Sequence, residues 1–483
     1  MSRRLLLALM LLFLSGCMSS TPPTPTAMPS PVPSPTATTM AATANVQAWI
    51  TTFDRQRLLA PADLRSDRGA ETTIVVDETM RYQRMEGFGA AMTDSAAWVL
   101  MRVLDEARRD EVMGNLFGPE GIRLSYLRVP MGASDFARRD YTYDDMERGQ
   151  VDPGLRRFNI EYDKPYILPA LRLAKALNPE LRFMASPWSA PAWMKQPPTL
   201  HGGRLNPAYY QAFADYHVRF VQAYAEEGIV IDALTPQNEP LHTSSSYPTM
   251  AMSAAEQATF VRDYLAPALR RAGLSTRILV FDHNWDLVDF PLEVLADPAT
   301  AAVVDGVAFH CYGGDVSAQS VVHRAHPDKG IWFTECSGGG WSTDFGANIV
   351  WNVRHLVVGN FRHWGNSLLL WNLALDENAG PQNGGCENCR GVVTVDSRDG
   401  SVTYNEEYYI LGHVSRFVRP GAYRIESTAP GRGVPPNVAF LNPDGSLALI
   451  VLAESPLALE IAWCGQSATF DLPGESLVTF VCR

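Results

Sequence analysis

The chain has little positive charge and few histidines or cysteines for its length. Among 483 residues, 40 Lys and Arg stand against 52 Asp and Glu, so the formal net charge is −12. Without a basic excess a protein gains little from phosphate backbones or anionic lipids, so we expect no nucleic-acid partner. Ten His and seven scattered Cys form no zinc-binding pattern. The chain also has no glycine-rich phosphate-binding loop and no Ser-His-Asp catalytic pattern. We expect neither a metal nor a cofactor.

Long apolar runs are missing as well, apart from one at the N-terminus. Leu5 to Leu14 is too short to span a bilayer and follows Arg3 and Arg4, a pattern typical of a secretory signal. The run ends in Leu14-Ser15-Gly16-Cys17, which resembles the lipobox of bacterial lipoproteins. The resemblance implies that Cys17 is lipidated and becomes the new N-terminus. A simple secretory signal with an incidental Cys is the alternative.

Residues 18–44 contain almost only Thr, Pro, Ser and Ala, with no charge and little to bury. Such a segment cannot offset the entropy lost on ordering, so we expect an extended stalk. These features predict an extracytoplasmic protein of the bacterial cell envelope, lipid-anchored or secreted. The lipid anchor is its only expected membrane contact, and the sequence leaves the oligomeric state open.

The body of the chain alternates short apolar runs with segments of helical periodicity. Such runs are typical of parallel strands buried on both faces. Eight follow one another: Gly87–Ala90, Leu124–Arg128, Arg182–Ser186, Ala233–Gln237, Ile278–Asp282, Val307–His310, Ile331–Glu335 and Leu368–Trp371. Helices are expected at Ser95–Val103, Lys164–Leu177, Pro207–Ala225 and Ala254–Ala272. Eight strand–helix repeats predict an α/β fold, the closed (β/α)8 TIM barrel.

A doubly wound open sheet is the rival architecture. It requires a glycine-rich phosphate loop after the first strand. Gly87-Phe88-Gly89, followed by Ala90-Ala91, lacks the third glycine of that loop. The closed barrel is therefore preferred.

The C-terminal part changes character. From Tyr408 onward, short alternating runs are separated by turns, which is typical of an antiparallel β-sandwich. The early run Thr72–Val76 is expected to pair into the same sheet, because a lone strand leaves an open edge. The expected organisation is a signal (1–17), a stalk (18–44), N-terminal strands of the sandwich (45–84), the catalytic barrel (85–407) and the remaining sandwich (408–483).

Polar and aromatic side chains gather at the carboxyl ends of the predicted strands, which face the active site in a barrel. They are Asp94, Arg128, Trp188, Asn238, Glu239, His310, Glu335 and Trp371. Glu239 follows the fourth strand and Glu335 ends the seventh. Both follow apolar runs, so neither belongs to a solvated charged face. Strands four and seven face each other across the barrel mouth.

Two carboxylates in a sugar-sized cleft suit the hydrolysis of a glycosidic bond. One donates a proton to the leaving oxygen, while the other attacks the sugar or activates water. A separation of about 5–5.5 Å means retention of configuration, and about 6.5–9.5 Å means inversion. Each Glu acting only as a helix cap or as the partner of an Arg is the alternative.

At this point the chain resembles glycoside hydrolase family 30, a family of retaining enzymes that includes glucosylceramidases and β-1,6-glucanases. The matching motifs are Gly87–Asp94, Leu127–Gly132, Ser186–Lys195, Gln237–Pro240 and Trp371–Leu375. Together they span most of residues 70–483. The resemblance implies a barrel with a β-sandwich formed by the C-terminus and a strand that precedes the barrel.

The resemblance also implies roles for individual residues. Glu239 matches the general acid/base and Glu335 the nucleophile. Arg128 matches an Arg near the nucleophile, where we expect it to lower the pKa of Glu335. Burial and the second carboxylate are expected to raise the pKa of Glu239, as an acid requires.

The remaining matches concern substrate binding. Asp94, Trp188 and Trp371 match residues around the sugar in the first subsite. Asn238 matches the Asn that contacts the 2-hydroxyl, and His310 and Tyr312 match an aromatic pair after strand six. Each of these has a structural alternative: core packing, a helix cap or an ion pair. Tyr247 either lines the site or belongs only to a loop.

Six of the seven cysteines invite pairing hypotheses. In an extracytoplasmic protein, Cys386 and Cys389 are expected to form a local disulfide, since two ligands are too few for structural zinc. Cys464 and Cys482 could form a second one in the sandwich. Cys311 follows His310 and Cys336 follows Glu335, and both are expected to be buried thiols. The loop 376–390, which carries the first pair, departs from the glucosylceramidase pattern.

The sequence therefore predicts a retaining β-glycosidase that cleaves β-glucosidic bonds, with glucosylceramide as the preferred substrate type. An endo-β-1,6-glucanase, or a family member active on xylan or fucosides, is the alternative. A surface glycan-binding protein on an inactive barrel is a remote third hypothesis. The expected partner is a β-linked glucan or glucoside.

Overall fold

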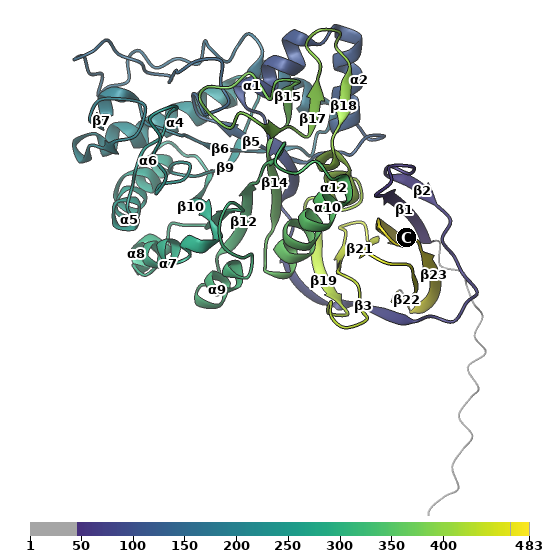
Figure 1. The fold of residues 1–483 in the computed structure, drawn as a ribbon. Helices are drawn as coiled ribbons and strands as arrows, with labels where there is room; N and C mark the ends of the chain where they lie inside the picture. Colours follow the sequence, from purple (N-terminus) through teal and green to yellow (C-terminus); the bar gives the residue numbers. More distant parts are fainter. Residues whose placement is uncertain (1–45, 464, 483) are drawn as a thin grey trace, which may run out of the picture. The chain divides into compact units, whose positions relative to one another are not determined.

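The computed structural model describes residues 46–463 and 465–482 (Figure 1). The predicted signal, Cys17, the stalk and Cys464 lie outside the described residues. Within them, none of the helices is long and apolar enough to cross a bilayer.

Eight parallel strands form the predicted barrel. They are β4 (Gly87–Ala91), β5 (Tyr126–Pro130), β6 (Arg182–Ser186), β9 (Ile231–Leu234), β10 (Arg277–Asn284), β11 (Gly306–His310), β12 (Gly330–Glu335) and β14 (Ser367–Asn372). The ladder runs β12-β11-β10-β9-β6-β5-β4-β14. Most of their side chains are buried because the strands face the barrel interior on one side and helices on the other. The predicted fold class is confirmed.

A serine hydroxyl helps to close the barrel between its seventh and eighth strands. Phe333 N donates to Ser367 Oγ over 3.0 Å, and Ser367 Oγ donates to Phe333 O over 3.1 Å. The backbone amide of Asn366 also bonds to Ile331 O. These bonds join β12 to β14 where the regular ladder is interrupted.

Helices follow the strands as the periodicity predicts. The α-helices are α1 (Asp94–Trp98), α2 (Glu106–Phe117), α3 (Ile167–Leu177), α4 (Tyr210–Glu226), α5 (Ala254–Phe260), α6 (Ala266–Arg271), α7 (Asp289–Leu295), α8 (Pro298–Ala301), α9 (Ala318–Ala325), α10 (Phe345–Asn352), α11 (Asn360–Arg362) and α12 (Glu406–Ser415). Single π-helical segments at Val99–Val103, Val261–Leu265 and Val353–Gly359 continue α1, α5 and α10. Thr93 caps α1 through a bond to the Ala96 amide, as a Thr at this position favours.

In the described part of the chain, nine strands form the sheet of the sandwich. They are β1 (Val46–Thr52), β2 (Ala60–Ala62), β3 (Thr72–Arg84), β19 (Tyr423–Ser427), β20 (Asn437–Leu441), β21 (Leu447–Ala453), β22 (Leu457–Trp463), β23 (Gln466–Leu472) and β24 (Ser476–Cys482). Their order is β2-β1-β24-β21-β20-β19-β3-β22-β23. The long strand β3 pairs antiparallel with β19 and parallel with β22, so the early strand joins the sheet as expected. Ile50, Leu449 and Ile461, from distant parts of the sheet, share one core, which makes it a sandwich.

The predicted boundary at residue 408 falls inside helix α12. Glu406 and Glu407 occupy its first turn, where the helix dipole favours acidic residues. The helix is apolar around most of its circumference because it is buried, so its sequence lacks a clear helical stripe. His413 in α12 bonds through its two ring nitrogens to Thr51 and Thr479 of the sandwich, each over 2.9 Å. The helix therefore joins the two domains.

Short strands outside these two sheets shape the loops at the carboxyl ends of the barrel strands. They are β7 (Lys195–Gln196), β8 (Arg204–Leu205), β13 (Gly338–Gly339), β15 (Ala374–Asp376), β16 (Cys389–Arg390), β17 (Val393–Val395) and β18 (Val402–Tyr404). β13 pairs with β16, which ties the segment after β12 to the cysteine-containing loop.

Candidate active site

Two glutamates from opposite sides of the barrel meet at its mouth. Glu239 follows β9 and Glu335 ends β12. One carboxylate oxygen of each, together with a ring nitrogen of His310, lie within 4.8 Å of one another. Glu239 adopts a left-handed backbone conformation (φ 44°), uncommon for a non-glycine residue and found mainly where a fold holds a functional side chain in place. The carboxylate oxygens of Glu239 and Glu335 within 4.8 Å of each other are too close for inversion and fit retention of configuration.

Arg128 lies at the centre of the cluster and is fully buried. Its Nη1 donates to Glu335 Oε2, and its Nη2 donates to Asn238 Oδ1 (2.8 Å) and to Asp282 Oδ2 (2.7 Å). The guanidinium carbon lies 4.8 Å from the centre of the Trp188 ring. The rigid, planar guanidinium group of Arg128 therefore orients both Glu335 and Asn238.

Asp282, which was not predicted from the sequence, lies in β10 and is also fully buried. Besides Arg128, its carboxylate accepts hydrogen bonds from Ser186, Thr235, Thr334 and His310, at 2.7–3.0 Å. Burial opposes ionisation, but the charges of Arg128 and His310 outweigh it and hold the pKa of Asp282 well below its ordinary value. An acid inside an otherwise apolar strand was the signal available in the sequence.

His310 stands between two carboxylates. Its Nδ1 faces Glu239 Oε1 at 2.9 Å and its Nε2 faces Asp282 Oδ1 at 3.0 Å. Burial lowers the pKa of His310, but Glu335 and Asp282 outweigh burial and raise it to about 9. A neutral imidazole has one N–H, so contact with both carboxylates requires a second proton, shared between His310 and Glu239.

The pKa values of the two glutamates differ from the expectation. Burial raises the pKa of Glu239, but the hydrogen bond and charge of His310 outweigh burial and leave it below the ordinary value. Burial raises the pKa of Glu335, and the opposing charges of His310 and Arg128 do not cancel that rise. Arg128 does lower the pKa of Glu335 as expected, but burial outweighs it and the net shift is upward. For Glu239 the expected rise was wrong, because His310 was not recognised as its proton partner.

Asp94 does not join the cluster. Its Oδ2 accepts bonds from the Arg138 amide (2.8 Å) and the Tyr162 hydroxyl (2.9 Å), and its Oδ1 accepts one from Tyr166 (2.5 Å). Both carboxylate oxygens of Asp94 are hydrogen-bonded and only 4 % of the residue is exposed, so its role is to stabilise the loop that follows β5. The prediction that it contacts substrate is not supported by this geometry.

Asp135 lies where Asp94 was expected. Its carboxylate accepts a hydrogen bond from the Trp371 side chain. Burial raises the pKa of Asp135 well above its ordinary value, and the charges of Glu335 and Glu239 add to the rise. It stands in the loop that follows β5, seven positions after Arg128, and its place after a barrel strand was the signal that could have identified it.

Aromatic side chains surround the acids. Trp188 stacks on Trp371 with ring centres 5.0 Å apart, and both are buried. Tyr312 donates its hydroxyl to Glu335 Oε1 over 2.9 Å. Tyr247 bonds to His242 over 2.8 Å, and burial, Asp135 and the two glutamates raise its pKa. The structure thus brings all the predicted side chains together except Asp94.

The loop 376–390 packs onto this side of the mouth. The Asn383 amide bonds to Asp135 O over 2.7 Å, and a Cβ on Gly385 would come within 2.8 Å of Asp135 Cβ. Cys386 and Cys389 are disulfide-bonded in this loop, as expected. The predicted bond between Cys464 and Cys482 involves a residue outside the described part and stays a prediction.

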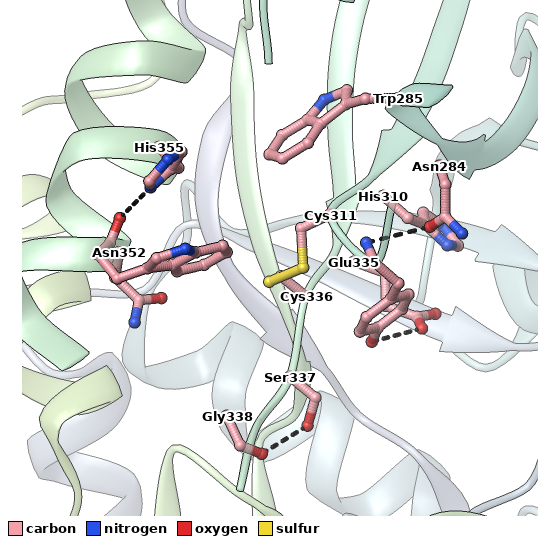
Figure 2. The surroundings of a disulfide bond; sticks show 12 residues. Asn284, Trp285, His310, Cys311, Glu335, Cys336, Ser337, Gly338, Asn352 and His355 are labelled. Carbon is pink, nitrogen blue, oxygen red and sulfur yellow. Dashed lines mark hydrogen bonds between the residues drawn. A yellow bond between two sulfur atoms is a disulfide. The ribbon is translucent and has the colours of Figure 1, made fainter. Parts of the chain in front are cut away.

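Cys311 and Cys336 also form a disulfide, so the expectation of buried thiols was wrong (Figure 2). They follow His310 and Glu335, which are register partners on β11 and β12. Neighbouring strands therefore place the two Cα atoms 5.4 Å apart, a distance typical of disulfides. The bond links the strand ends that carry two members of the cluster.

Glu239, His310 and Glu335 are also the kind of group that can ligate a metal ion. Here, however, Arg128 and Tyr312 already occupy the two oxygens of Glu335, and carboxylates engage both nitrogens of His310. A guanidinium beside the group also repels a cation. The described arrangement suits proton transfer and covalent catalysis better than metal binding.

Comparisons with known proteins agree with this geometry. The model of the glycosyl hydrolase family 30 TIM-barrel domain matches residues 85–418, and that of the family 30 beta sandwich domain matches residues 421–480. The chain is 33% identical to endo-1,6-beta-D-glucanase BGN16.3 of Trichoderma harzianum over 88% of this chain and 90% of that protein. It is 29% identical to lysosomal acid glucosylceramidase of Mus musculus, over 89% and 87%. The solved endo-beta1,6-glucanase BT3312 superposes with a TM-score of 0.84 at 33% identity, covering 91% of this chain and 99% of that one.

Proposed function

Because this chain belongs to glycosyl hydrolase family 30, we propose that it is a retaining endo-β-1,6-glucanase. The observation that carries the mechanism is the approach of Glu239, Glu335 and His310 to within 4.8 Å of one another. The substrate is argued from the relatives: those named endo-1,6-glucanases are 33% identical, whereas the mouse glucosylceramidase is 29% identical. The alternative drawn from the sequence is thus better supported than glucosylceramide.

In the first step, Glu335 attacks the anomeric carbon of the glucosyl unit. A bond forms between that carbon and a Glu335 oxygen, while the bond to the leaving oxygen breaks. The proton shared by Glu239 and His310 passes through Glu239 to the leaving oxygen, which departs as a hydroxyl group. Arg128 and Tyr312 hold the attacking carboxylate in place.

In the second step, water replaces the leaving group. Glu239 accepts a proton from the water as its oxygen attacks the anomeric carbon, and the bond to Glu335 breaks. The released proton returns to the Glu239–His310 pair. The two inversions together retain the β configuration.

The glycone is proposed to be glucose, held by Asp135 and the Trp188–Trp371 wall. Because its pKa is raised, the Asp135 carboxyl can donate as well as accept a hydrogen bond to sugar hydroxyls, and a sugar that lacks or misplaces those hydroxyls loses these bonds. Asp135 therefore has the sugar-binding role that was predicted for Asp94.

Product analysis on a substrate panel tests the proposal. We expect β-1,6-glucan to yield a series of short β-1,6-linked oligosaccharides at early times. Glucosylceramide and xylan should be cleaved much more slowly. Release of glucose alone from the first time point contradicts endo action, and faster cleavage of glucosylceramide returns the assignment to that lipid.

The pH dependence of kcat/KM should be bell-shaped and should narrow in His310→Asn. Activity requires ionised Glu335, so the acid limb lies above the ordinary pKa of Glu. It also requires the proton of the Glu239–His310 pair, which is lost as the pH rises through about 9. Without His310 the positive charge that lowers the pKa of Glu335 is gone, so the acid limb moves up, while the alkaline limb moves down.

The matched control for this profile is His326→Asn, at the C-terminal end of α9. It should leave both limbs in place. A His310→Asn enzyme with the wild-type profile and only a lower rate contradicts the shared proton.

A further inference from the structure

Lys195 is a buried lysine that the proposed mechanism does not use. It begins β7, and only 2% of the residue is exposed. Burial lowers the pKa of Lys195 to about 7, and no carboxylate among the described residues opposes this shift. A buried charge costs free energy unless hydrogen bonds compensate for it, so lysines are rarely found in such positions. The bonds that this ammonium group makes indicate what the fold gains from it.

The ammonium group of Lys195 donates three hydrogen bonds. Its acceptors are Ser189 Oγ (2.6 Å), Leu200 O (2.8 Å) and Thr249 O (2.7 Å). Two of these are backbone carbonyls, and the Ser189 hydroxyl already donates to Ala190 O over 2.9 Å, so all three atoms act as acceptors. Only the protonated amine has three N–H groups. The arrangement therefore uses every donor of the charged lysine.

The bond to Ser189 reaches the segment that follows β6. This segment supports the backbone next to Glu239, because the Asn238 amide donates to Pro187 O over 2.8 Å. Pro187 lies two residues before Ser189 in the same segment. Through this bond Lys195 fixes one of the two pieces of backbone that hold Glu239.

The bond to Thr249 reaches the base of the loop that begins with Glu239. The Met252 amide donates to Pro240 O over 2.8 Å, which closes this loop. The Thr249 amide donates to Leu200 O over 3.1 Å, so the loop base and the lysine share an acceptor. The ammonium group thus anchors the loop at the point where it closes.

Glu239 depends on such support because of its backbone conformation. Its φ of 44° lies in the left-handed region, which is unfavourable for a residue other than glycine and persists only where the surrounding structure fixes it. Its amide donates to Asp282 O over 3.0 Å, which holds it from β10. An acid must lie within about 2.6–3.2 Å of the atom that it protonates, so a small backbone shift weakens proton transfer.

We propose that Lys195 is a positioning residue for Glu239. Its ammonium group joins the segment after β6 to the loop that begins with Glu239, and so keeps the acid/base carboxyl where it can deliver its proton to the leaving oxygen. Because Lys195 is buried, it acts through Glu239 and not on the substrate. The inference rests on the proposed retaining mechanism, in which Glu239 is the acid and the base.

Two aryl β-glucosides with different leaving groups test this role. The 4-methoxyphenyl glucoside needs a proton on its leaving oxygen, whereas the 2,4-dinitrophenyl glucoside does not. In Lys195→Met, which keeps the side-chain length without the donors, we expect kcat/KM to fall about 10²-fold on the first substrate, as for a displaced catalytic group, and to change little on the second. On the dinitrophenyl substrate kcat and KM should fall together, because a misplaced base lets the glycosyl-enzyme accumulate.

Lys175→Met is the matched control. Lys175 also donates to two backbone carbonyls, those of Pro179 (2.9 Å) and Leu181 (2.7 Å), and burial also lowers its pKa. It lies before the amino end of β6, at the opposite end of the barrel from the mouth. The variant should keep the wild-type ratio of the two kcat/KM values. An equal loss on both substrates in Lys195→Met indicates a general structural role and overturns the proposal, and so does an unchanged ratio.

Ser189→Ala removes one acceptor of the ammonium group and decides the test if Lys195→Met does not fold. It should lower kcat/KM on the methoxyphenyl substrate more than on the dinitrophenyl substrate, in the same direction as Lys195→Met but less. A wild-type ratio in Ser189→Ala then overturns the proposal. Failure of the proposed function has a different signature, because Glu239→Ala would lose both substrates equally. If Glu239→Ala depends on the leaving group and the lysine and serine variants do not, only the positioning role is wrong.

Discussion

Glu335→Gln abolishes turnover of all β-glucosides, whereas Glu239→Ala still reacts with aryl glucosides that have acidic leaving groups. This is the expected result if Glu335 forms the covalent intermediate and Glu239 moves the proton. Without a nucleophile there is no first step. Without the acid, a leaving group that needs no proton still departs, while substrates with sugar leaving groups lose about 10²–10⁴-fold.

The Glu239→Ala intermediate should then accumulate, because no base activates water. Azide needs no such activation, so it should restore turnover and give the β-glucosyl azide, detectable by mass spectrometry and NMR. Glu293→Gln, in α7 away from the mouth, is the control and should behave as wild type. Equal losses in both active-site variants without azide rescue would remove this assignment of roles.

Asp282→Asn should lower the free energy of unfolding by about 3–5 kcal/mol and eliminate activity. Asp282 and Arg128 are both fully buried, and removing the Asp282 charge leaves Arg128 with Glu335 as its one remaining carboxylate partner among the described residues, which is costly in a buried ion pair. The variant also replaces an acceptor of five hydrogen bonds by an amide that must turn its NH2 toward donors. Urea unfolding and kcat/KM on an aryl β-glucoside measure the two effects.

Asp263→Asn provides the matched comparison. Asp263 also pairs with an arginine, Arg262, but both side chains are partly exposed (45% and 35%). Exposed pairs contribute about 0–1 kcal/mol, so this variant should unfold close to wild type. If Asp282→Asn is equally mild, the buried network does not organise the site as described.

The barrel was predictable because its strands carry their signal locally. Each is a short apolar run buried on both faces, and each expected run overlaps a strand of the structure. Helix α12 was not predictable in this way, because burial on most sides removes the helical stripe and its Tyr-rich sequence also fits a strand.

The site residues were predictable where their position at the carboxyl end of a barrel strand determines their place. That rule placed Glu239, Glu335, Arg128 and His310 together. It included Asp94 and passed over Asp135, because both follow barrel strands and only the tertiary contacts distinguish them. The direction of the pKa shift of Glu239 was also beyond the sequence, since it depends on His310 facing two carboxylates at once.

The bond between Cys311 and Cys336 has a consequence for the space beside Glu335. The interior of a TIM barrel is made rigid by layers of bulky side chains that fill it. Here a covalent link two sulfur atoms long joins the ends of β11 and β12. This disulfide makes the strand ends rigid while occupying little volume. The region next to Glu335 can therefore be rigid and still contain a cavity.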